Sequence, residues 1–354
     1  MSANSPATAA AGSPADSPVS SVAGGPAAQA IAARASVAPT APVAPAAPVA
    51  PTAPAALDLA INQPDVALIF EGGGMRNSYT AGMVQLLLAR NLNFGRVYGI
   101  SAGSSHTVNY LVRSPIRARE SFVELVKYPR FGGWGSFLRG KGYFNGPYLY
   151  EELIDTAAPD EPMAFDWDMF CANPADLHIE AMDWDTSETV AWTKADMAVA
   201  HDVGLMVRAS STMPLFMPPT TIAGRTYVDG GMGESWGILL NAARADGFER
   251  FCIIRTQPRG YRKKPLGAAI QTLFRLAFRK HPLVAERTIA RWQPYNALCD
   301  EIEALERTGA AWVFYPDIME VTNKTTDYDA LVRSFETGLA QAHRDIDRLQ
   351  EWLG

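Results

Sequence analysis

Cysteine, histidine and long apolar runs are all scarce in this sequence. Its 354 residues include only 3 cysteines and 5 histidines. Cys171, Cys252 and Cys299 lie far apart and form no C-x-x-C pair, which argues against a disulfide framework and against a zinc site. No stretch approaches the roughly 18 to 20 apolar residues that a membrane-spanning helix needs. We therefore expect no metal or other cofactor, no membrane span, and a reducing, cytoplasmic location.

An excess of positive charge is also missing. Lys and Arg number 31 against 37 Asp and Glu, so the net charge is −6 at pH 7 and the isoelectric point is near 5.5. This balance argues against nucleic acid as a general partner. With 48% hydrophobic residues, the chain has enough apolar material for one large core or two small ones. The sequence does not indicate an oligomeric state.

Residues 1–64 lack aromatic side chains altogether and carry only three charges, on Asp16, Arg34 and Asp58. A segment of this kind buries too little surface to offset the entropy that ordering costs. From Pro39 to Pro54 a proline falls at every third position, the period of polyproline II. We predict a disordered Ala- and Pro-rich tail. It has neither the basic start nor the apolar stretch of an export signal.

Two glycine-rich motifs dominate the part that follows. Three glycines follow the apolar run 66–70 after Glu71, and a G-x-S-x-G motif surrounds Ser101. Between a strand and a helix, G-x-S-x-G forms a nucleophile elbow, a tight turn that presents the serine at the start of the helix. Ser101 is therefore the candidate nucleophile. The candidate groups for stabilising an oxyanion are the amides of Gly72, Gly73, Gly74 and Ala102, with the positive charge of Arg76 nearby.

Each motif has a plainer interpretation when it is taken alone. G-x-S-x-G also suits an ordinary strand-to-helix turn, and Gly72 to Gly74 would equally suit a phosphate-binding loop. The pairing of the two motifs separates these alternatives, because a nucleotide loop of the Walker type requires a Gly-Lys-Ser/Thr ending that is absent here.

A third motif, Tyr227-Val228-Asp229-Gly230-Gly231, places an aspartate at the tip of a turn. A plain Asp-Gly turn is the commoner use of that dipeptide. However, G-G-G-x-R, G-x-S-x-G and D-G-G in this order resemble the patatin-like phospholipase family. The resemblance covers residues 65–354 and extends to a bacterial subgroup with its own C-terminal extension, through four further segments: residues 142–145, 207–214, 260–263 and 312–316. Asn77 departs from it, since the family usually has glycine there.

The resemblance implies a serine hydrolase that cleaves lipid carboxylic esters, like a phospholipase A or a lysophospholipase. Asp229 would take the proton of Ser101 directly, with no histidine between them, and an acyl-enzyme would form. Phospholipids or other acyl esters would be the substrates, with peripheral contact to the inner face of the membrane as an open alternative. A general esterase or thioesterase acting on soluble acyl substrates is the second interpretation. A non-catalytic membrane- or partner-binding module is the third.

Histidine provides the main rival to this dyad. Ser101, Asp229 and His343 follow one another in the order of an α/β-hydrolase triad. His343, however, lies off the apolar stripe of its helix, and His106 lies one turn beyond Ser101 on a predicted helix. We therefore favour the dyad.

The expected fold is a three-layer α/β patatin-like fold, with a mostly parallel central sheet between helices and a helical C-terminal extension. We predict strands at 66–70, 96–100, 177–182, 188–193 and 251–255, and a helix at 102–112. Residues 65–250 would form the catalytic domain. Residues 251–354 would complete the sheet and add helices, including a C-terminal helix whose apolar stripe runs from Leu331 to Leu353.

Three surface segments allow more than one interpretation. The aromatic stretch 128–150 would be a lid or acyl-chain wall, or else a loop packed on the core. The apolar loop 213–217 would line a lipid pocket or simply pack. Residues 255–291 are strongly basic, and within them the amphipathic helix 266–278 would lie either on anionic lipid or against the core.

Overall fold

The computed structural model of this protein describes residues 58–354. Most of the predicted tail, residues 1–57, lies outside the described residues. Where that tail was expected to end, the side chain of Asn93 donates hydrogen bonds to the carbonyls of Asp58 and Ala60. The first strand then begins at Gln63, ahead of the predicted start at Val66.

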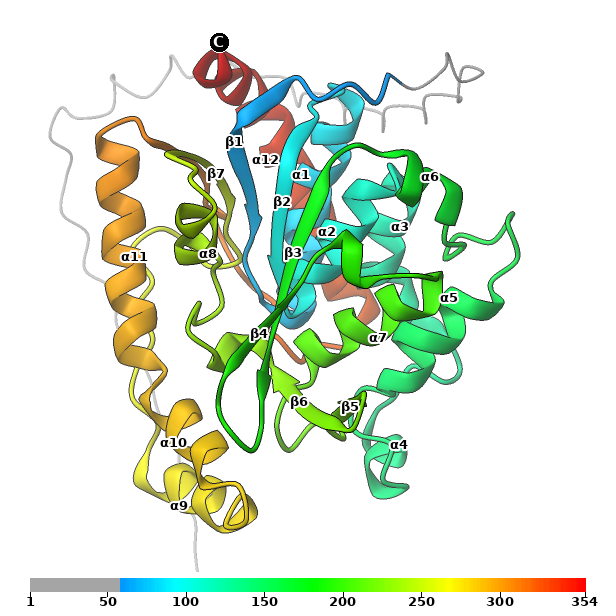
Figure 1. Ribbon diagram of the computed structural model, residues 1–354, viewed down its shortest axis with the longest axis vertical. Helices are drawn as coiled ribbons and strands as arrows, with labels where there is room; N and C mark the ends of the chain where they lie inside the picture. The colour runs from blue at the N-terminus through cyan, green and yellow to red at the C-terminus, as the bar shows by residue number, and fades with distance from the viewer. Residues whose placement is uncertain (1–57) are drawn as a thin grey trace, which may run out of the picture. The chain divides into compact units, whose positions relative to one another are not determined.

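Within the described residues, eight strands form one mixed sheet in the order β5-β6-β3-β2-β1-β7-β8, with β4 paired to β3 (Figure 1). All pairings among β1, β2, β3, β7 and β8 are parallel. The pairings of β4 with β3, of β6 with β3 and of β5 with β6 are antiparallel. The strands are β1 Gln63–Phe70, β2 Phe94–Ile100, β3 Asp176–Asp183, β4 Thr189–Trp192, β5 Thr220–Ile222, β6 Arg225–Asp229, β7 Arg250–Ile254 and β8 Ala311–Phe314. The expected mostly parallel sheet is confirmed.

Helices cover both faces of the sheet. They are α1 Asn77–Ala89, α2 Ala102–Leu111, α3 Pro115–Arg119, α4 Trp134–Leu138, α5 Leu153–Thr156, α6 Trp167–Ala172, α7 Ala200–Ser211, α8 Leu240–Ala245, α9 Ala268–Ala277, α10 Pro282–Ala290, α11 Trp292–Arg307 and α12 Tyr328–Leu353. In Figure 1, α8 and α11 lie on one side of β1 and β2, and α1, α2 and α12 lie on the other. The layered α/β class predicted from the sequence is confirmed.

The apolar run 66–70 within β1 explains this arrangement. Alternate residues of a strand point to opposite faces of its sheet. Val66, Leu68 and Phe70 therefore join the core under α1, α2 and α12, whereas Ala67 and Ile69 join the core under α8 and α11. A strand that is buried on both faces has no polar position left, which accounts for the continuous apolar run.

The C-terminal part of the chain completes both the sheet and its covering layer. β7 pairs with β1, β8 pairs with β7, and α12 packs along α1. The predicted stripe of α12 faces the protein, where Leu331, Ala342 and Ile346 are fully buried. Among residues 58–354, no helix has both the length and the apolar character needed to cross a bilayer.

Candidate active site

Ser101 occupies the sharp turn between β2 and α2. Its backbone has φ 54° and ψ −132°, a conformation that side-chain-bearing residues rarely adopt and that is typical of a strained functional turn. The Ser101 amide donates to the Oγ of Ser210 at 2.9 Å, and the Oγ of Ser104 donates to the Ser101 carbonyl. The first bond fixes the turn to α7, which contains Ser210, and the second fixes it to the first turn of α2.

The second glycine of G-x-S-x-G brings α2 against the end of β1. A Cβ atom on Gly103 would lie 2.3 Å from the carbonyl oxygen of Phe70, closer than real Cβ contacts come. Any larger residue would push the start of α2, and with it Ser101, away from the glycine-rich loop that follows β1.

Asp229 is the last residue of β6, and it faces Ser101 across the end of β3. Ile100 is level with Glu180 on one side of β3, and Asp229 is level with Ala181 on the other. This register brings together two residues that lie 128 positions apart. The Oγ of Ser101 donates to Oδ2 of Asp229 at 2.7 Å.

The orientation of the carboxylate is fixed by its surroundings. Oδ1 of Asp229 accepts from the amide of Gly231 at 2.7 Å, and the Asp229 amide donates to the carbonyl of Thr212 at 2.8 Å. Oδ2 is therefore directed to the serine. Ser101 is 9% exposed and Asp229 7% exposed, so the bond between them forms where little water competes for it.

No histidine bonds to either residue, and all five histidines lie in the described part of the chain. His343 is exposed on α12. His106 is fully buried, with Nε2 3.0 Å from Oγ1 of Thr80 and 3.1 Å from the Asn77 carbonyl. Burial lowers the pKa of His106 to about 3, so the ring is neutral. The other three bond elsewhere, His178 to Glu180, His201 to Asp155 and His281 to Asp185.

The predicted oxyanion donors are not all available. The Gly72 amide already donates to the carbonyl of Gly237 at 3.1 Å, so we remove Gly72 from the donor set. In the region that the structure describes, the amides of Gly73, Gly74 and Ala102 have no acceptor. Gly74 has φ +56° at the start of the turn into α1, and Ala102 is the first residue of α2. These three amides therefore remain the candidate donors for a negative charge that develops on a substrate at Ser101.

Arg76 caps α1 and lines the cleft that contains Ser101 and Asp229. Its Nε is buried without a hydrogen-bond partner. Burial lowers the pKa of Arg76, although the carboxylate of Glu71 acts in the opposite direction. Its charge therefore faces the cleft rather than a paired acid.

A buried ion pair supports the glycine-rich loop from below. Glu71 accepts from Nε of Arg255 at 2.8 Å, from the Thr256 amide at 2.7 Å and from the Tyr295 hydroxyl at 2.6 Å. Burial alone would raise the pKa of Glu71, but Arg255 and these hydrogen bonds hold it below its ordinary value. Thr256 also donates through Oγ1 to the Gly72 carbonyl. The loop is thus fixed to the end of β7 and to α11.

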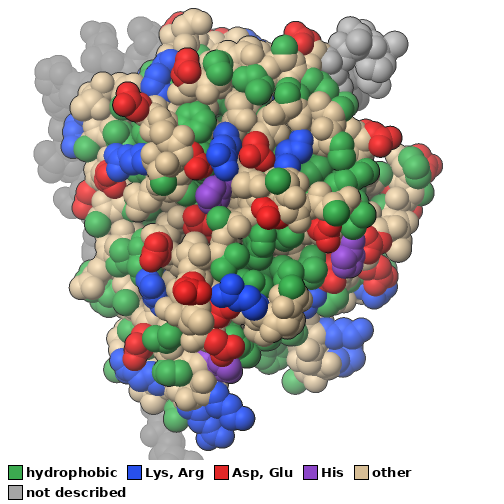
Figure 2. Space-filling model, in the orientation of Figure 1, with side chains coloured by type: hydrophobic (Ala, Val, Ile, Leu, Met, Phe, Trp, Pro, Cys, Tyr) green, Lys and Arg blue, Asp and Glu red, His purple; other side chains and the backbone are tan. Residues whose placement is uncertain are grey.

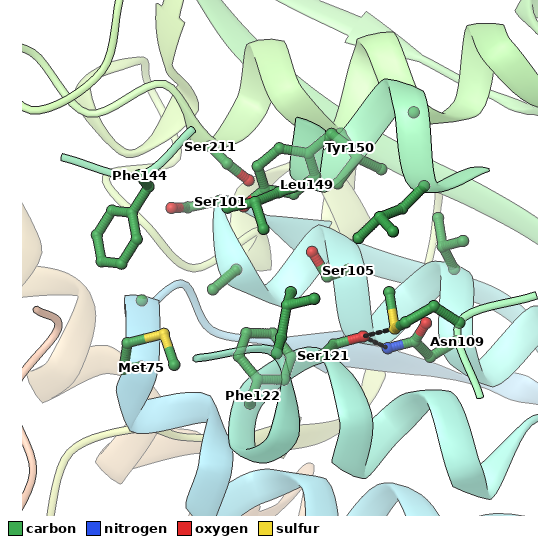
Figure 3. Close-up of a pocket in the computed structure, with 18 of the residues that line it drawn as sticks. Met75, Ser101, Ser105, Asn109, Ser121, Phe122, Phe144, Leu149, Tyr150 and Ser211 are labelled. Carbon is green, nitrogen blue, oxygen red and sulfur yellow. Dashed lines mark hydrogen bonds between the residues drawn. The ribbon is translucent and has the colours of Figure 1, made fainter. Parts of the chain in front are cut away.

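An apolar pocket opens at Ser101 and runs along α2 (Figure 3). It encloses about 860 Å³ of space free of protein atoms, its open mouth included. Met75 and Phe122 lie on one side of it in Figure 3, and Leu149 and Tyr150 lie on the other. Its far end is polar, where Nδ2 of Asn109 donates to the Ser121 Oγ at 3.1 Å.

The ambiguous surface segments take up different places around this site. In the 128–150 stretch, Phe131 and Phe144 are buried in the pocket wall, whereas Trp134 and Leu138 on α4 are exposed. Met213 and Met217 also line the pocket. The amphipathic helix forms as α9, none of whose residues is fully buried, and Phe278 just after it packs, partly buried, against a core cluster that includes Met232 and Val284.

Three residues at the site were not predicted as part of it. Ser210 holds the elbow amide, and Lys263 and Arg291 line the cleft beside Asp229. The only signal for the last two in the sequence is the basic stretch 255–291. Sequence alone does not separate its exposed cations from the two that turn inward.

Two family models match the chain. The model of the patatin-like phospholipase family matches residues 68–241, and a domain of unknown function, DUF6363, matches residues 281–354. The uncharacterized protein YjjU of Escherichia coli strain K12 is 27% identical over 216 residues, which are 58% of this chain and 56% of YjjU. The chain therefore matches only a little more than half of that relative's length.

Among solved structures, VipD from Legionella pneumophila is similar at 13% identity and a TM-score of 0.45, over 80% of this chain and 67% of that one. The family predicted from the three motifs is confirmed by the matched models. The second matched domain lies inside the predicted C-terminal extension. The chain therefore carries a patatin-like phospholipase domain at residues 68–241, followed by a C-terminal DUF6363 extension.

Proposed function

We propose that this protein is a lipid acyl hydrolase in which Ser101 is the nucleophile and Asp229 the base. The observation that carries the proposal is the 2.7 Å bond from the Ser101 Oγ to Oδ2 of Asp229, in a turn with the strained backbone of a nucleophile elbow. The patatin-like domain supports the same reaction class.

In the first half of the reaction, the Ser101 Oγ attacks the ester carbonyl while its proton passes to Oδ2 of Asp229. The carbonyl oxygen becomes an oxyanion within reach of the amides of Gly73, Gly74 and Ala102. One such donor contributes about 10²- to 10³-fold to kcat in hydrolases of this type. When the tetrahedral intermediate collapses, the C–O bond to the alcohol breaks, and Asp229 returns the proton to the departing oxygen.

In the second half, water replaces the alcohol. Asp229 accepts one proton of the water, whose oxygen attacks the acyl-enzyme carbonyl, and the same amides stabilise the second oxyanion. Collapse releases the fatty acid and returns the proton to the Ser101 oxygen. The amide of Gly231, which holds Oδ1, keeps Oδ2 aligned through both halves.

The apolar pocket supports an acyl chain as the part of the substrate that is recognised. Its walls are mostly Met, Phe and Leu side chains, with the hydroxyls of Ser105 and Ser211 near Ser101 and further polar groups at its far end. A chain that enters from Ser101 gains hydrophobic burial with each methylene, about 0.8 kcal/mol for a fully buried one.

Exposed apolar side chains on α4 and α9 support peripheral contact with a membrane. Trp134 and Leu138 on α4 are 69% and 84% exposed, and Leu276 on α9 is 66% exposed. The α4 side chain Phe137 and the end of α9 border one cleft, and both helices lie at the lower end of Figure 1. Figure 2 shows Lys and Arg side chains at this end of the described region, with Asp and Glu side chains among them, and the cations suit anionic headgroups.

The test is a chain-length series of p-nitrophenyl esters and monoacylglycerols, assayed with the parent protein, Ser101→Ala and Asp229→Asn. We expect kcat/KM to rise from the two-carbon ester to the long-chain esters, and both variants to lose about 10²- to 10⁴-fold in kcat. A preference for the shortest esters would favour a general esterase instead. A folded parent with no hydrolysis of any ester would favour a binding module.

A further inference from the structure

A second compartment borders Ser101 and Asp229, next to the acyl pocket. It encloses about 870 Å³ of space free of protein atoms, its open mouth included. The two compartments share only Gly74, Ser101 and Met213 among their lining residues. The first is lined mainly by apolar side chains. The second carries three cationic side chains, Arg76, Lys263 and Arg291, against one carboxylate, that of Asp229.

Arg291 lies at the junction of α10 and α11 and reaches back onto the D-G-G turn. A Cβ atom on Gly231 would lie 2.5 Å from Nη2 of Arg291, and one on Gly237 would lie 2.7 Å from it. The guanidinium donates to the Trp236 carbonyl through Nε and Nη2, both at 3.3 Å. Among the described residues it forms no ion pair with a carboxylate. Glycine at position 231 thus leaves room for a cation directly beside the catalytic turn.

Lys263 lines the same compartment as Arg291, and its loop is fixed to α11. Its backbone amide donates to Oδ1 of Asn296 at 2.7 Å, and Nδ2 of Asn296 donates back to the Lys263 carbonyl at 2.9 Å. Nζ lies 3.1 Å from the centre of the Tyr295 ring. The loop geometry therefore points the amine into the compartment.

The neighbours of Lys263 in sequence behave differently. Arg259 pairs with Glu306, and Arg262 pairs with Asp300 and Glu303. Lys263 has no acid partner within the described range. Burial and the charges of Arg291 and Arg76 lower the pKa of Lys263 well below its ordinary value, so its amine takes up a proton most readily when an anion enters the compartment.

The acids nearby do not neutralise these three cations. Glu71 is bound by Arg255, the Tyr295 hydroxyl and the Thr256 amide. Both oxygens of Asp229 are bound by Ser101 and Gly231. Converging cations with no acid partner are the arrangement that proteins use to bind phosphate and carboxylate groups.

We propose that this compartment binds a phosphate group carried by the alcohol part of the ester, so that the enzyme selects acyl esters of phosphate-bearing alcohols. The inference rests on the proposed function, because it assigns a binding site to the alcohol part of the ester that Ser101 would cleave. The acyl chain lies in the apolar pocket, the ester lies at Ser101, and the phosphate meets Arg76, Lys263 and Arg291. A headgroup that ends in a quaternary ammonium would bring a fourth cation to this site and is disfavoured.

The kinetic test compares three substrates with the same acyl chain: lysophosphatidic acid, lysophosphatidylcholine and monoacylglycerol. We expect the parent to hydrolyse lysophosphatidic acid with a kcat/KM at least tenfold above that of each of the other two. In Lys263→Met and in Arg291→Met, this preference should fall tenfold or more. Lys264→Met, at the exposed neighbouring position outside the compartment, is the matched control and should keep the parental ratio. A parental ratio near one would overturn the inference.

Arg291→Lys keeps a positive charge if Arg291→Met does not fold, and it should retain part of the preference. Unchanged ratios in folded variants at both positions would also overturn the inference.

A binding measurement separates this inference from the proposed function. Calorimetry on the parent should detect sn-glycerol 3-phosphate, with a Kd at least tenfold higher in Lys263→Met and unchanged in Lys264→Met. Inorganic phosphate distinguishes the free anion from the esterified one, and we expect it to bind more weakly than glycerol 3-phosphate. If no ester is hydrolysed but glycerol 3-phosphate binds in this pattern, the proposed function fails and the anion site stands. If esters are hydrolysed but neither phosphate compound binds, the anion site fails alone.

Discussion

At the scale of single residues, the position of Ser101 depends on Gly99 and Gly103, which have no side chain. The glycines on either side of the elbow allow α2 to approach β1 and β2 closely. Gly103→Ala would place a methyl group 2.3 Å from the Phe70 carbonyl oxygen. We expect the free energy of unfolding to fall by about 1 to 3 kcal/mol, as overpacked sites do.

Chemical denaturation of the purified variant measures this effect. Gly95→Ala is the matched control on β2, because its Cβ atom would come no closer than 3.6 Å to its nearest neighbour, Ile61. Equal stabilities for the two variants would contradict the close approach of α2.

His106 makes a pH-dependent contribution to stability. Burial holds its pKa at about 3 in the folded protein, whereas the ordinary value in an unfolded chain is about 6.5. Above pH 6.5 neither state binds the proton, so the group has no effect. As pH falls from 6.5 toward 3, the unfolded chain binds a proton that the folded protein does not, and stability is lost.

The melting temperature should therefore fall less between pH 7 and pH 5 in His106→Gln than in the parent. His343→Gln, with its exposed ring on α12, is the control and should follow the parent. A His106→Gln curve parallel to the parental one would show that the buried ring is not the source of the acid sensitivity.

The sequence predicts Ser101 and Asp229 correctly as neighbours because each lies in a motif that encodes a local turn, and parallel strands bring such turns to one edge of a sheet. It does not predict that the Gly72 amide is occupied, since the acceptor is Gly237, far along the chain. The bond from the Ser101 amide to Ser210 cannot be predicted either, because Ser210 also lies far along the chain. Hydrogen-bond partners set by tertiary structure leave no local pattern.

At the scale of elements, α4 and α9 present apolar side chains to solvent around the cleft that Phe137 and Ala277 both line. We expect Leu138→Asp and Leu276→Asp each to weaken binding to vesicles that contain anionic lipid, because each removes apolar surface and adds repulsive charge. Ile116→Asp, at a residue of α3 that is 61% exposed, is the control for an apolar side chain elsewhere.

Co-sedimentation with vesicles, with and without anionic lipid, measures the difference. The account predicts a loss of severalfold or more for the α4 and α9 variants and parental binding for Ile116→Asp. Equal binding by all three variants would mean that this edge does not meet the membrane.

Most of the predicted strands are observed within a few residues, because buried parallel strands are short, continuous apolar runs. The environment of α9 could not be predicted in this way. Its amphipathic period fits a helix on the core as well as a helix on a membrane, and only the surrounding chain decides that Ile270 and Leu273 stay exposed. Likewise, nothing local distinguishes Lys263, which turns inward, from Arg262, which pairs on the surface.

At the scale of the whole described region, the patatin-like part and the C-terminal extension share one core. Residues 281–354 supply β8, which pairs with β7, and the buried face of α12 against α1. They also supply Tyr295 beneath the glycine-rich loop and Arg291 at the D-G-G turn. The extension is therefore part of the structure that supports the site.

A chain that ends at residue 280 should consequently fail to fold cooperatively. It would lose the apolar contacts of Ala342, Ile346 and Leu349 and would expose β7 as an edge strand with no partner on its β8 side, which favours aggregation. Thermal unfolding followed by circular dichroism, together with size-exclusion chromatography, would measure this. A soluble truncated chain with one sharp transition would contradict the shared core.

The most direct test of the central claim is fluorophosphonate labelling followed by mass spectrometry of the intact protein and its peptides. The account predicts one adduct on Ser101, lost in Ser101→Ala, strongly slowed in Asp229→Asn and formed at the parental rate in His343→Ala. Labelling that persists in Ser101→Ala, or that disappears in a folded His343→Ala, would contradict a Ser101–Asp229 dyad.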